Sequence, residues 1–432
     1  MAKPPSNSQK KLVGLHRNAL INQWHAIKDS LTKRPPDHTM HGLVDENKFT
    51  WLLKCLCHLG YRRYPYQVYI KPKENDGIFK LHAAQGHETT IALLSDWASD
   101  TQESQHVASL VGPVDYSIHL GDTYYIGNSK EIADNFNDTF DAPWPYGSLG
   151  SFAMLGNHEM YSSGKSYFTE LLPYMGIYAG QEIVQRQEAG FFCLENDHWR
   201  IIGLDTGYNS STGWLGWVTN TRMQLRDEQL TWLRETVRPD KDRRGIIFLS
   251  HHQPVSAFDR HEFQTFLCQL DDLFTTDRVV LWFCGHEHAL ALYGQNSLGK
   301  NLHGFVRCIG YGGMPVEIRH LVPKSTDVGH PANRNLVLYD KRIRNVIGGN
   351  IPLGHNGFAQ LRLQGQHLFV DYYNDAAGNV KNLLLTEQWL IDRDSGKLTG
   401  VSITDHTRTG SANGEADGLT HFQDDLTKAI GQ

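Results

Sequence analysis

The feature that most constrains the fold is a series of short apolar runs, each of which ends in polar residues. Six such runs follow residue 78, namely TIALLSDW, YSIHLGD, FAMLGNHE, RIIGLDT, GIIFLSHH and VVLWFCGHEH. Runs of four to six apolar residues with β-branched members are typical of buried strands. Amphipathic helical segments lie between several of them, most clearly from Met223 to Val237. Strands that alternate with helices predict an α/β layered domain, in which functional side chains gather beyond the strand ends.

The chain divides into three segments by the character of its sequence. Residues 1–80 contain helical candidates at about 15–31 and 46–59, and we predict a mostly helical N-terminal extension of unknown role. Residues 81–390 hold the strand-like runs, including GFAQLRLQGQHLFVDYY, which alternates as a hairpin does. Residues 391–432 are rich in small and polar residues, which predicts a flexible C-terminal tail.

Composition and charge exclude several classes of protein. The hydrophobic fraction of 40% and the charged fraction of 20% are those of a globular protein. The formal net charge of −6, without a long Lys/Arg block, argues against a sequence-independent nucleic-acid binder. We find neither the apolar stretch of a secretion signal nor a membrane span, and we therefore predict a cytoplasmic protein. The six scattered cysteines are then expected to be reduced thiols: Cys55, Cys57, Cys193, Cys268, Cys284 and Cys308.

The polar residues at the ends of these runs are those of a metal site. In chain order they are Asp96, Asp122, Tyr125, Asn157, His158, His251, His286 and His288. Taken singly, an Asp after a strand is usually a turn or helix cap, and a buried His is usually a packed core residue. Together, carboxylates and imidazoles at one sheet edge suit divalent or trivalent cations, and an Asp can bridge two of them. Two cations about 3.5–4 Å apart can clamp a phosphate and polarise a water.

The motifs GD at residues 121–122, GNHE at 156–159 and GHEH at 285–288 resemble those of the calcineurin-like metallophosphoesterase superfamily. The stretch SDWAS at 95–99 is similar to the Asp-Trp-Gly stretch of the tartrate-resistant purple acid phosphatases, with Ala98 where most other members have a ligand His. Tyr125 follows Asp122 by three residues, where purple acid phosphatases have a tyrosine that binds ferric iron. The resemblance covers about residues 88–375. It implies an α/β (α+β sandwich) fold with two facing mixed β-sheets flanked by helices.

The resemblance also implies a ligand set for two metal ions. The first ion, ferric in the family, would be bound by Asp96, Asp122, Tyr125 and His288. The second ion, a divalent iron, zinc or manganese, would be bound by Asp122 as the bridge, Asn157, His251 and His286. His158 would face the substrate phosphate or protonate the leaving alkoxide, and His261 would be a second histidine on the substrate side.

Three assignments in this set have alternatives. The family has a His, one residue and then Pro after its fourth strand, whereas this chain has His251-His252-Gln253-Pro254. We prefer His251 as the ligand because it directly follows the apolar run, with His252 as a polar loop residue. Tyr125 can instead pack in the core with its hydroxyl on backbone. His261 can equally be a solvated residue at the start of a helix.

The sequence predicts an enzyme that hydrolyses phosphate monoesters of small molecules by direct attack of a metal-bound hydroxide. The same site could instead act on phosphodiesters, such as cyclic nucleotides, phospholipid head groups or nucleic-acid ends. It could also hold manganese, zinc or two irons without a bond from tyrosine to ferric iron. A third hypothesis is a non-catalytic metal-binding interaction module, although such modules typically lose ligands and this chain has the expected set. The oligomeric state has no signature in the sequence.

Overall fold

A computed structural model describes residues 62–71, 73–84, 86, 88–137, 144–210, 223–258, 264–324, 335–344, 351–377, 380–408 and 418–432. The predicted helices at about 15–31 and 46–59, the cysteines Cys55 and Cys57, and the candidate residue His261 lie outside these ranges. Within them, no helix has both the length and the apolar character needed to cross a membrane.

The described residues form two mixed β-sheets of nine strands each, as the sequence predicted. The first sheet has the order β1 (Ile78–Lys80), β7 (Phe192–Glu195), β8 (Trp199–Leu204), β9 (Gly245–Ser250), β10 (Arg278–Cys284), β12 (Leu302–Ile309), β11 (Leu290–Ser297), β13 (Leu336–Tyr339) and β18 (Thr420–His421). The second has the order β17 (Lys397–Asp405), β16 (Asn382–Asp392), β15 (His367–Asn374), β14 (Gly357–Gln364), β2 (Glu88–Leu94), β3 (Tyr116–His119), β4 (Gly150–Ala153), β5 (Gly176–Ala179) and β6 (Glu182–Arg186).

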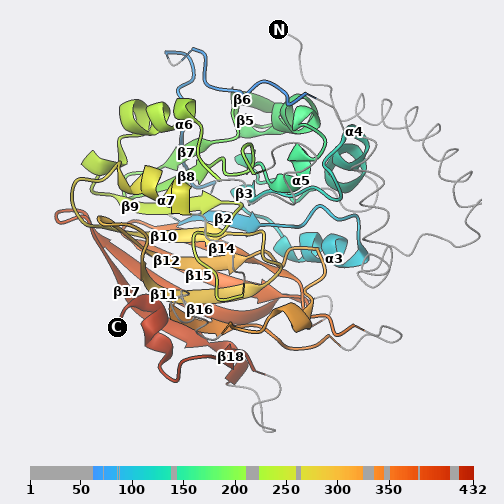
Figure 1. The fold of residues 1–432 in the computed structure, drawn as a ribbon, viewed down its shortest axis with the longest axis vertical. Coiled ribbons are helices and arrows are strands. Elements are labelled where there is room, and N and C mark those ends of the chain that lie inside the picture. Colours follow the sequence, from blue (N-terminus) through green and yellow to red (C-terminus); the bar gives the residue numbers. More distant parts are fainter. Residues whose placement is uncertain are drawn as a thin grey trace, which may run out of the picture.

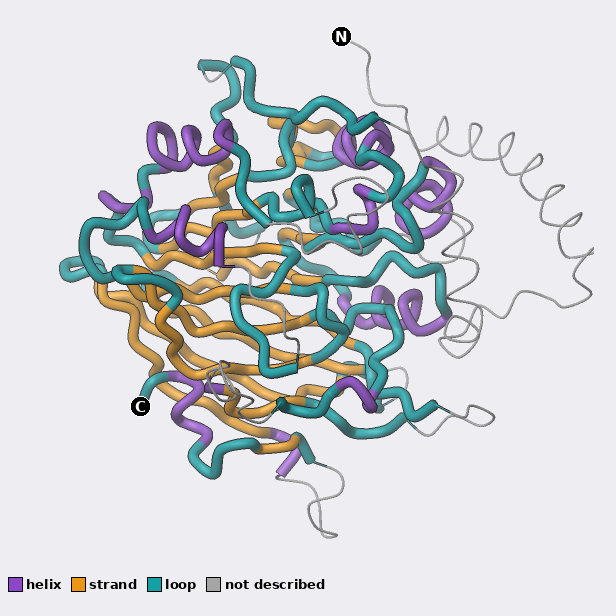
Figure 2. Tube along the Cα trace, in the orientation of Figure 1, coloured by secondary structure: helices purple, strands orange, loops and turns teal. Residues whose placement is uncertain are grey.

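Helices lie at the periphery of the strands (Figures 1 and 2). The α-helices are α3 (Gln102–Val111), α4 (Ser129–Glu131), α5 (Asn157–Met160), α6 (Asp227–Trp232) and α7 (Gln264–Asp271). Short π-helical segments span Ile132–Asn137, Tyr167–Leu171 and Leu233–Val237. Short 3-10 segments span Leu172–Tyr174, Pro239–Lys241, Ile318–His320, His406–Arg408 and Leu426–Ile430. The predicted helix from Met223 to Val237 is thus shorter as an α-helix, since it begins at Asp227 and its last turn is π-helical.

Strand β2 shows how one sequence supplies two hydrophobic layers. Side chains alternate across a strand, so neighbouring residues face opposite sides of the sheet. Ile91 and Leu93 belong to the large core that both sheets share, together with residues such as Ile247 of the first sheet. Ala92 and Leu94 belong to a second core, which includes residues of α3. All four are fully buried, which explains why the run TIALL has no polar member after its threonine.

The parallel pairing of the predicted strands brings their carboxyl ends together. In the second sheet β2, β3 and β4 are parallel neighbours, with Leu94 beside His119. In the first sheet β8, β9, β10 and β12 are parallel neighbours, with Ser250 beside Cys284. All six apolar runs predicted from the sequence are strands of these two sheets. The polar residues that follow them therefore lie at corresponding sheet edges.

The predicted flexible tail needs correction for the residues that the structure describes. Strand β17 pairs with β16 along the edge of the second sheet, so the tail is part of the fold. Leu398 is buried, as are Ala429 and Ile430 near the C-terminus. The predicted boundary at residue 80 also falls inside the fold, because β1 pairs with β7. Small polar residues obscured the strand in the tail, because an edge strand needs apolar side chains on one face only.

Candidate metal centre

Three loops that follow strands hold their key residues in left-handed backbone conformations. The φ angles are +56° at Asp96, +71° at Asp122 and +67° at His286. Residues other than glycine rarely adopt such angles, and each costs of order 1–3 kcal/mol. These residues follow β2, β3 and β10, and the three strained positions lie where the loops after these strands come together. Strain of this kind clusters at functional sites.

The glycines of the motifs leave the space in which these loops approach one another. A Cβ atom on Gly156 would lie 2.0 Å from Oδ1 of Asp122. A Cβ atom on Gly285 would lie 1.7 Å from Oγ of Ser95 and 2.6 Å from Oδ2 of Asp96. All three distances are shorter than any van der Waals contact. The glycines of GNHE and GHEH are therefore required by close packing against the carboxylates of the site.

Asp122 lies at the middle of the cluster and is 1% exposed. Its Oδ1 accepts a hydrogen bond of 3.0 Å from the backbone N–H of His158. Its Oδ2 lies 3.1 Å from the hydroxyl of Tyr124 and 3.1 Å from Nε2 of His251. Burial raises the pKa of Asp122, but the charges of His251 and His158 outweigh burial and hold that pKa well below its usual range. The carboxylate is therefore available as a charged ligand.

Asp96 is the second buried carboxylate and is fixed on both oxygens. Its Oδ2 accepts hydrogen bonds from Oγ of Ser95 at 2.7 Å and from the backbone N–H of His286 at 2.9 Å. Its Oδ1 lies 3.4 Å from Nε2 of His288. Burial alone would raise the pKa of Asp96, but the hydrogen bond with His288 and the charge of His251 lower it to about 2. Asp96 thus joins the loops after β2 and β10.

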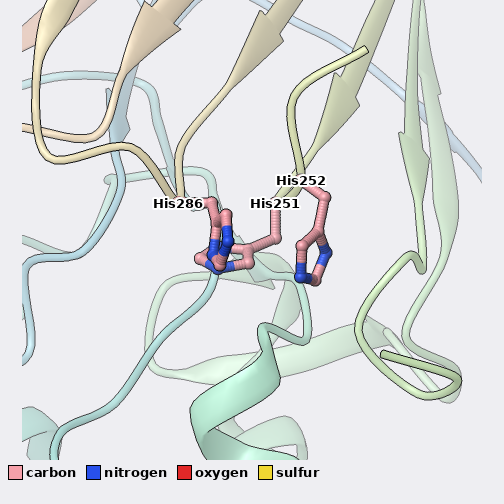
Figure 3. A group of neighbouring side chains, drawn as sticks. All are labelled: His251, His252 and His286. Carbon is pink, nitrogen blue, oxygen red and sulfur yellow. The ribbon is translucent and has the colours of Figure 1, made fainter. Parts of the chain in front are cut away.

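Three imidazoles lie side by side after β9 and β10 (Figure 3). The ring centroids are 4.8 Å apart for His251 and His252, 5.2 Å for His251 and His286, and 4.6 Å for His252 and His286. Burial, together with the neighbouring imidazoles, lowers the pKa of His286 to about 4 and that of His252 well below its usual value. For His251, burial is outweighed by the charge of Asp122, which raises its pKa to about 9. A metal ion would have to displace that proton from His251.

His252 therefore has more than the loop role that the sequence suggested. It is 2% exposed, and its Nδ1 lies 3.0 Å from the hydroxyl of Thr206. His251 keeps the position predicted for a ligand, since its Nε2 lies between Asp122 and Asn157. The structure brings both histidines to the site, and the extra residue before Pro254 signalled that the loop differs from the family pattern.

Asn157 and His158 follow β4 at the start of α5. The amide nitrogen of Asn157 donates to the hydroxyl of Tyr161 at 3.1 Å, so its Oδ1 faces Nε2 of His251 at 3.2 Å. Nδ1 of His158 donates to the carbonyl oxygen of Tyr125 at 2.6 Å. This bond fixes the imidazole, and its Nε2 lies 3.8 Å from Oδ2 of Asp122. His158 thus lies beside the centre with Nε2 directed to it.

The tyrosine whose hydroxyl reaches the carboxylates is Tyr124, whereas the sequence prediction named Tyr125. The Tyr124 hydroxyl lies 2.6 Å from Oδ1 of Asp96 and 2.9 Å from Nε2 of His288, in addition to its contact with Asp122. Burial and the two carboxylates raise the pKa of Tyr124 well above its usual value, so a cation would be needed to ionise it. The spacing of GDTYY predicts a tyrosine in the loop. Which of two adjacent tyrosines faces inward depends on backbone conformation, which spacing does not specify.

The backbone of Tyr124 explains this orientation. Its N–H donates to the carbonyl of Ala98 at 3.0 Å, and its own carbonyl accepts from the side chain of Asn135 at 2.6 Å. Ala98 and Thr123 also form an isolated parallel β-bridge. The loop after β3 is therefore held against the loop after β2. Ala98, small and fully buried, allows this close contact.

Tyr124→Phe is expected to reduce activity about 10- to 100-fold, because the hydroxyl contacts three of the proposed ligand residues. Tyr125→Phe is the matched control and is expected to stay within about twofold of the parent. Metal content and activity of both variants would be measured together with visible absorption. A charge-transfer band that disappears in Tyr125→Phe and persists in Tyr124→Phe would restore the original assignment.

Glu159 links the loops that carry Asp122 and Asn157. Its Oε1 accepts from the backbone N–H of Thr123 at 2.6 Å, and its Oε2 accepts from that of Gly156 at 2.9 Å. Burial, reinforced by the charge of Asp122, raises the pKa of Glu159 to about 7. Glu159 is fully buried and positions two loops rather than facing a ligand.

The side chains of this cluster offer ligand atoms that suit two neighbouring cations. Ligand atoms of Asp96, Asp122 and His251 lie within 4.8 Å of one another, as do those of His251, His252 and His286. Carboxylate oxygens and imidazole nitrogens are the donors that iron, manganese and zinc accept. The predicted residues Asp96, Asp122, Asn157, His158, His251, His286 and His288 are brought together by the contacts described above.

A match to a protein-family model agrees with this fold. Residues 87–290 match the family model of the calcineurin-like phosphoesterases, which confirms the resemblance predicted from the motifs. Similar solved structures include GAP50, the anchor in the inner membrane complex of Plasmodium, with 13% identity, a TM-score of 0.46 and coverage of 71% of this chain and 90% of that one. For PhoD the identity is 12%, the TM-score 0.42 and the coverage 74% and 72%. For purple acid phosphatase PPD1 from yellow lupin the identity is 13% and the TM-score 0.42, with coverage of 68% of this chain and 53% of that one. No curated protein sequence matches the chain.

Proposed function

We propose, with the calcineurin-like phosphoesterase match of residues 87–290 as the premise, that the chain is a binuclear metal-dependent phosphoesterase that hydrolyses phosphate monoesters. The observation that supports this most strongly is the position of Asp122. Its carboxylate is buried, and its Oδ2 lies 3.1 Å from Nε2 of His251 and 3.1 Å from the hydroxyl of Tyr124, which also contacts Asp96. A charged carboxylate that contacts both groups of donors is what a bridging ligand requires.

In this proposal one metal ion is bound by Asp96, Asp122 and His288, with Tyr124 in place of Tyr125. The other is bound by Asp122, Asn157, His251 and His286, with His252 as a further donor. The ions supply Lewis-acid charge to the phosphate and acidify a water, whichever of iron, zinc or manganese is present. The protein residues hold the ions at fixed positions, so that their charge is already oriented when the reaction begins.

His158 is the proposed proton donor to the leaving oxygen. Its Nδ1 is engaged by the Tyr125 carbonyl, so the exchangeable proton that can reach substrate is the one on Nε2. The side chain is 19% exposed, which leaves it open to a bound ester. The ring is also stacked beside Tyr124 and Tyr161, with centroids 4.3 and 5.1 Å away, and is therefore held in place.

The enzyme is expected to hydrolyse p-nitrophenyl phosphate at least about tenfold faster, in kcat/KM, than bis(p-nitrophenyl) phosphate. A monoester places more negative charge between two cations, and electrostatic stabilisation is the main source of rate in such reactions. Both rates would be measured on one preparation of known metal content, before and after chelation. Faster cleavage of the diester would identify a phosphodiesterase. A fully metal-loaded protein that cleaves neither ester would identify a binding module.

A further inference from the structure

A pocket of about 270 Å³ adjoins the candidate metal centre, and His286 and His288 form part of its wall. A phosphate held at the centre would have these two histidines beside it. The organic part of the ester would then extend into the pocket that they border. A space of this size suits a small group of a few carbon atoms and is smaller than a typical drug-sized site.

One part of the pocket wall is apolar. It is formed by Phe258, Pro315 and Leu321, which come from the loop after β9 and from the segment that follows β12. Phe258 and Leu321 are each 7% exposed, so their positions are fixed by packing. The ring of Phe258 packs edge-on against Tyr339 at a centroid distance of 5.4 Å. An aromatic face of this kind contacts carbon atoms and also attracts a cation.

The charged residues of the wall are acidic. Glu287 lies between the two histidines in the chain, and its Oε1 accepts a hydrogen bond from the hydroxyl of Ser256. Glu317 also lines the pocket, from the segment after β12, where its Oε2 is paired with Arg319 and lies 3.9 Å from Nε2 of His320. The side chain of Arg319 is 50% exposed, and ion pairs on so exposed a side chain contribute little. None of the described residues that line this pocket is a Lys or an Arg.

We propose that this pocket binds the alcohol part of the substrate and selects a small alcohol that carries a positive charge, such as an amino alcohol or its quaternary ammonium form. The inference rests on the proposed phosphoesterase function and adds the substrate class. Glu287 and Glu317 attract the cationic nitrogen, while Phe258 and its apolar neighbours contact the attached carbons. The same carboxylates repel a second anionic group, so nucleotides and sugar bisphosphates are disfavoured.

The experiment compares two esters of the same shape on the metal-loaded enzyme. Choline phosphate has a quaternary nitrogen where 3,3-dimethylbutyl phosphate has a carbon, so the two differ in charge alone. We expect kcat/KM for choline phosphate to exceed that for the neutral ester by about tenfold or more, since ionic and cation–π contacts of a quaternary ammonium group have this magnitude. p-Nitrophenyl phosphate is assayed in parallel as a substrate that does not depend on the cationic contact.

The variant Glu317→Gln removes one charge and keeps the size of the side chain. It is expected to reduce kcat/KM for choline phosphate several-fold more than kcat/KM for the neutral ester. Glu182→Gln, at an exposed position on β6, is the control and should keep the preference of the parent. A uniform loss on both esters in Glu317→Gln would indicate structural damage and overturn the role of its charge.

The two proposals fail in different ways. Turnover of p-nitrophenyl phosphate with equal rates on the two alkyl esters, or a faster rate on the neutral ester, overturns the pocket inference and leaves the phosphoesterase function intact. No turnover of any monoester by a protein with two bound metal ions overturns the function itself. A preference that keeps its full size in the double variant Glu287→Gln/Glu317→Gln also overturns the inference, because no acidic side chain of the described lining then remains.

Discussion

Asp122→Asn is expected to lose most of its bound metal and to reduce kcat by about 1,000-fold or more, since each cation supplies several kcal/mol of stabilisation to the transition state. The substitution replaces one carboxylate oxygen by an amide nitrogen, which cannot bind a cation. The buried amide would also face Nε2 of His251 and the hydroxyl of Tyr124, both of which now contact Oδ2. The bridge and the neutralising charge are lost together.

Metal content by elemental analysis and steady-state kinetics on p-nitrophenyl phosphate would be measured on the same sample. Asp115→Asn is a suitable control, because Asp115 is also buried and directly precedes β3, whereas Asp122 follows the same strand. Asp115 accepts hydrogen bonds from the backbone of Ala84 and Thr90, so it tests the loss of a buried carboxylate without the metal centre. Two metal ions per chain in purified Asp122→Asn would contradict the bridging role.

His158→Ala is the second change with a large expected effect. We expect kcat to fall about 100- to 10,000-fold on an alkyl phosphate, the range for loss of a general acid, while metal content stays at the parent level. Two contacts of His158 explain why kcat and metal content are expected to respond differently. Its backbone N–H, which Ala retains, donates to Asp122. Its imidazole, which Ala lacks, donates to the backbone carbonyl of Tyr125, and its Nε2 lies 3.8 Å from Oδ2 of Asp122, beyond hydrogen-bonding distance.

The leaving group distinguishes proton donation from phosphate binding. p-Nitrophenolate departs without a proton, so His158→Ala should be impaired far less on p-nitrophenyl phosphate than on an alkyl phosphate. Parent and variant would be compared on both substrates at saturating concentration. An equal loss of kcat on the two substrates would show that His158 binds or orients phosphate instead. Loss of metal in the variant would assign it a role in the centre's structure.

Much of the fold could be predicted because the core strands carry a local signal. The run GIIFLS has six residues and every one of them is buried in β9. A strand buried on both faces must be apolar throughout, and a loop at its end must be polar. The edge strand β17 lacks this signal, since only Leu398, Gly400 and Asp405 of its residues are buried and several of the others are small and polar. The tail was therefore predicted as flexible although it completes a sheet.

The candidate site divides in the same way. Asp96, Asp122 and His286 could be found because a glycine-rich motif and an apolar run mark each loop. The sequence could not show whether Tyr124 or Tyr125 faces the site, or that His252 also lies in it. Adjacent residues in a loop differ in the direction of their side chains, and the sequence does not specify that direction. His261 stays a prediction, since it lies outside the described residues.

By itself the sequence determined which segments become buried strands and which donor types follow them. Both are properties of consecutive residues, namely apolar runs and the polar atoms at their ends. The tertiary structure decided which donors share one centre, which tyrosine faces the carboxylates, and that a small acidic pocket adjoins His286 and His288. The reason is that β2, β3, β9 and β10 are far apart in the chain, and distances between their loops are set by sheet pairing and backbone conformation. Amino-acid composition contains no information on sheet pairing or on backbone conformation.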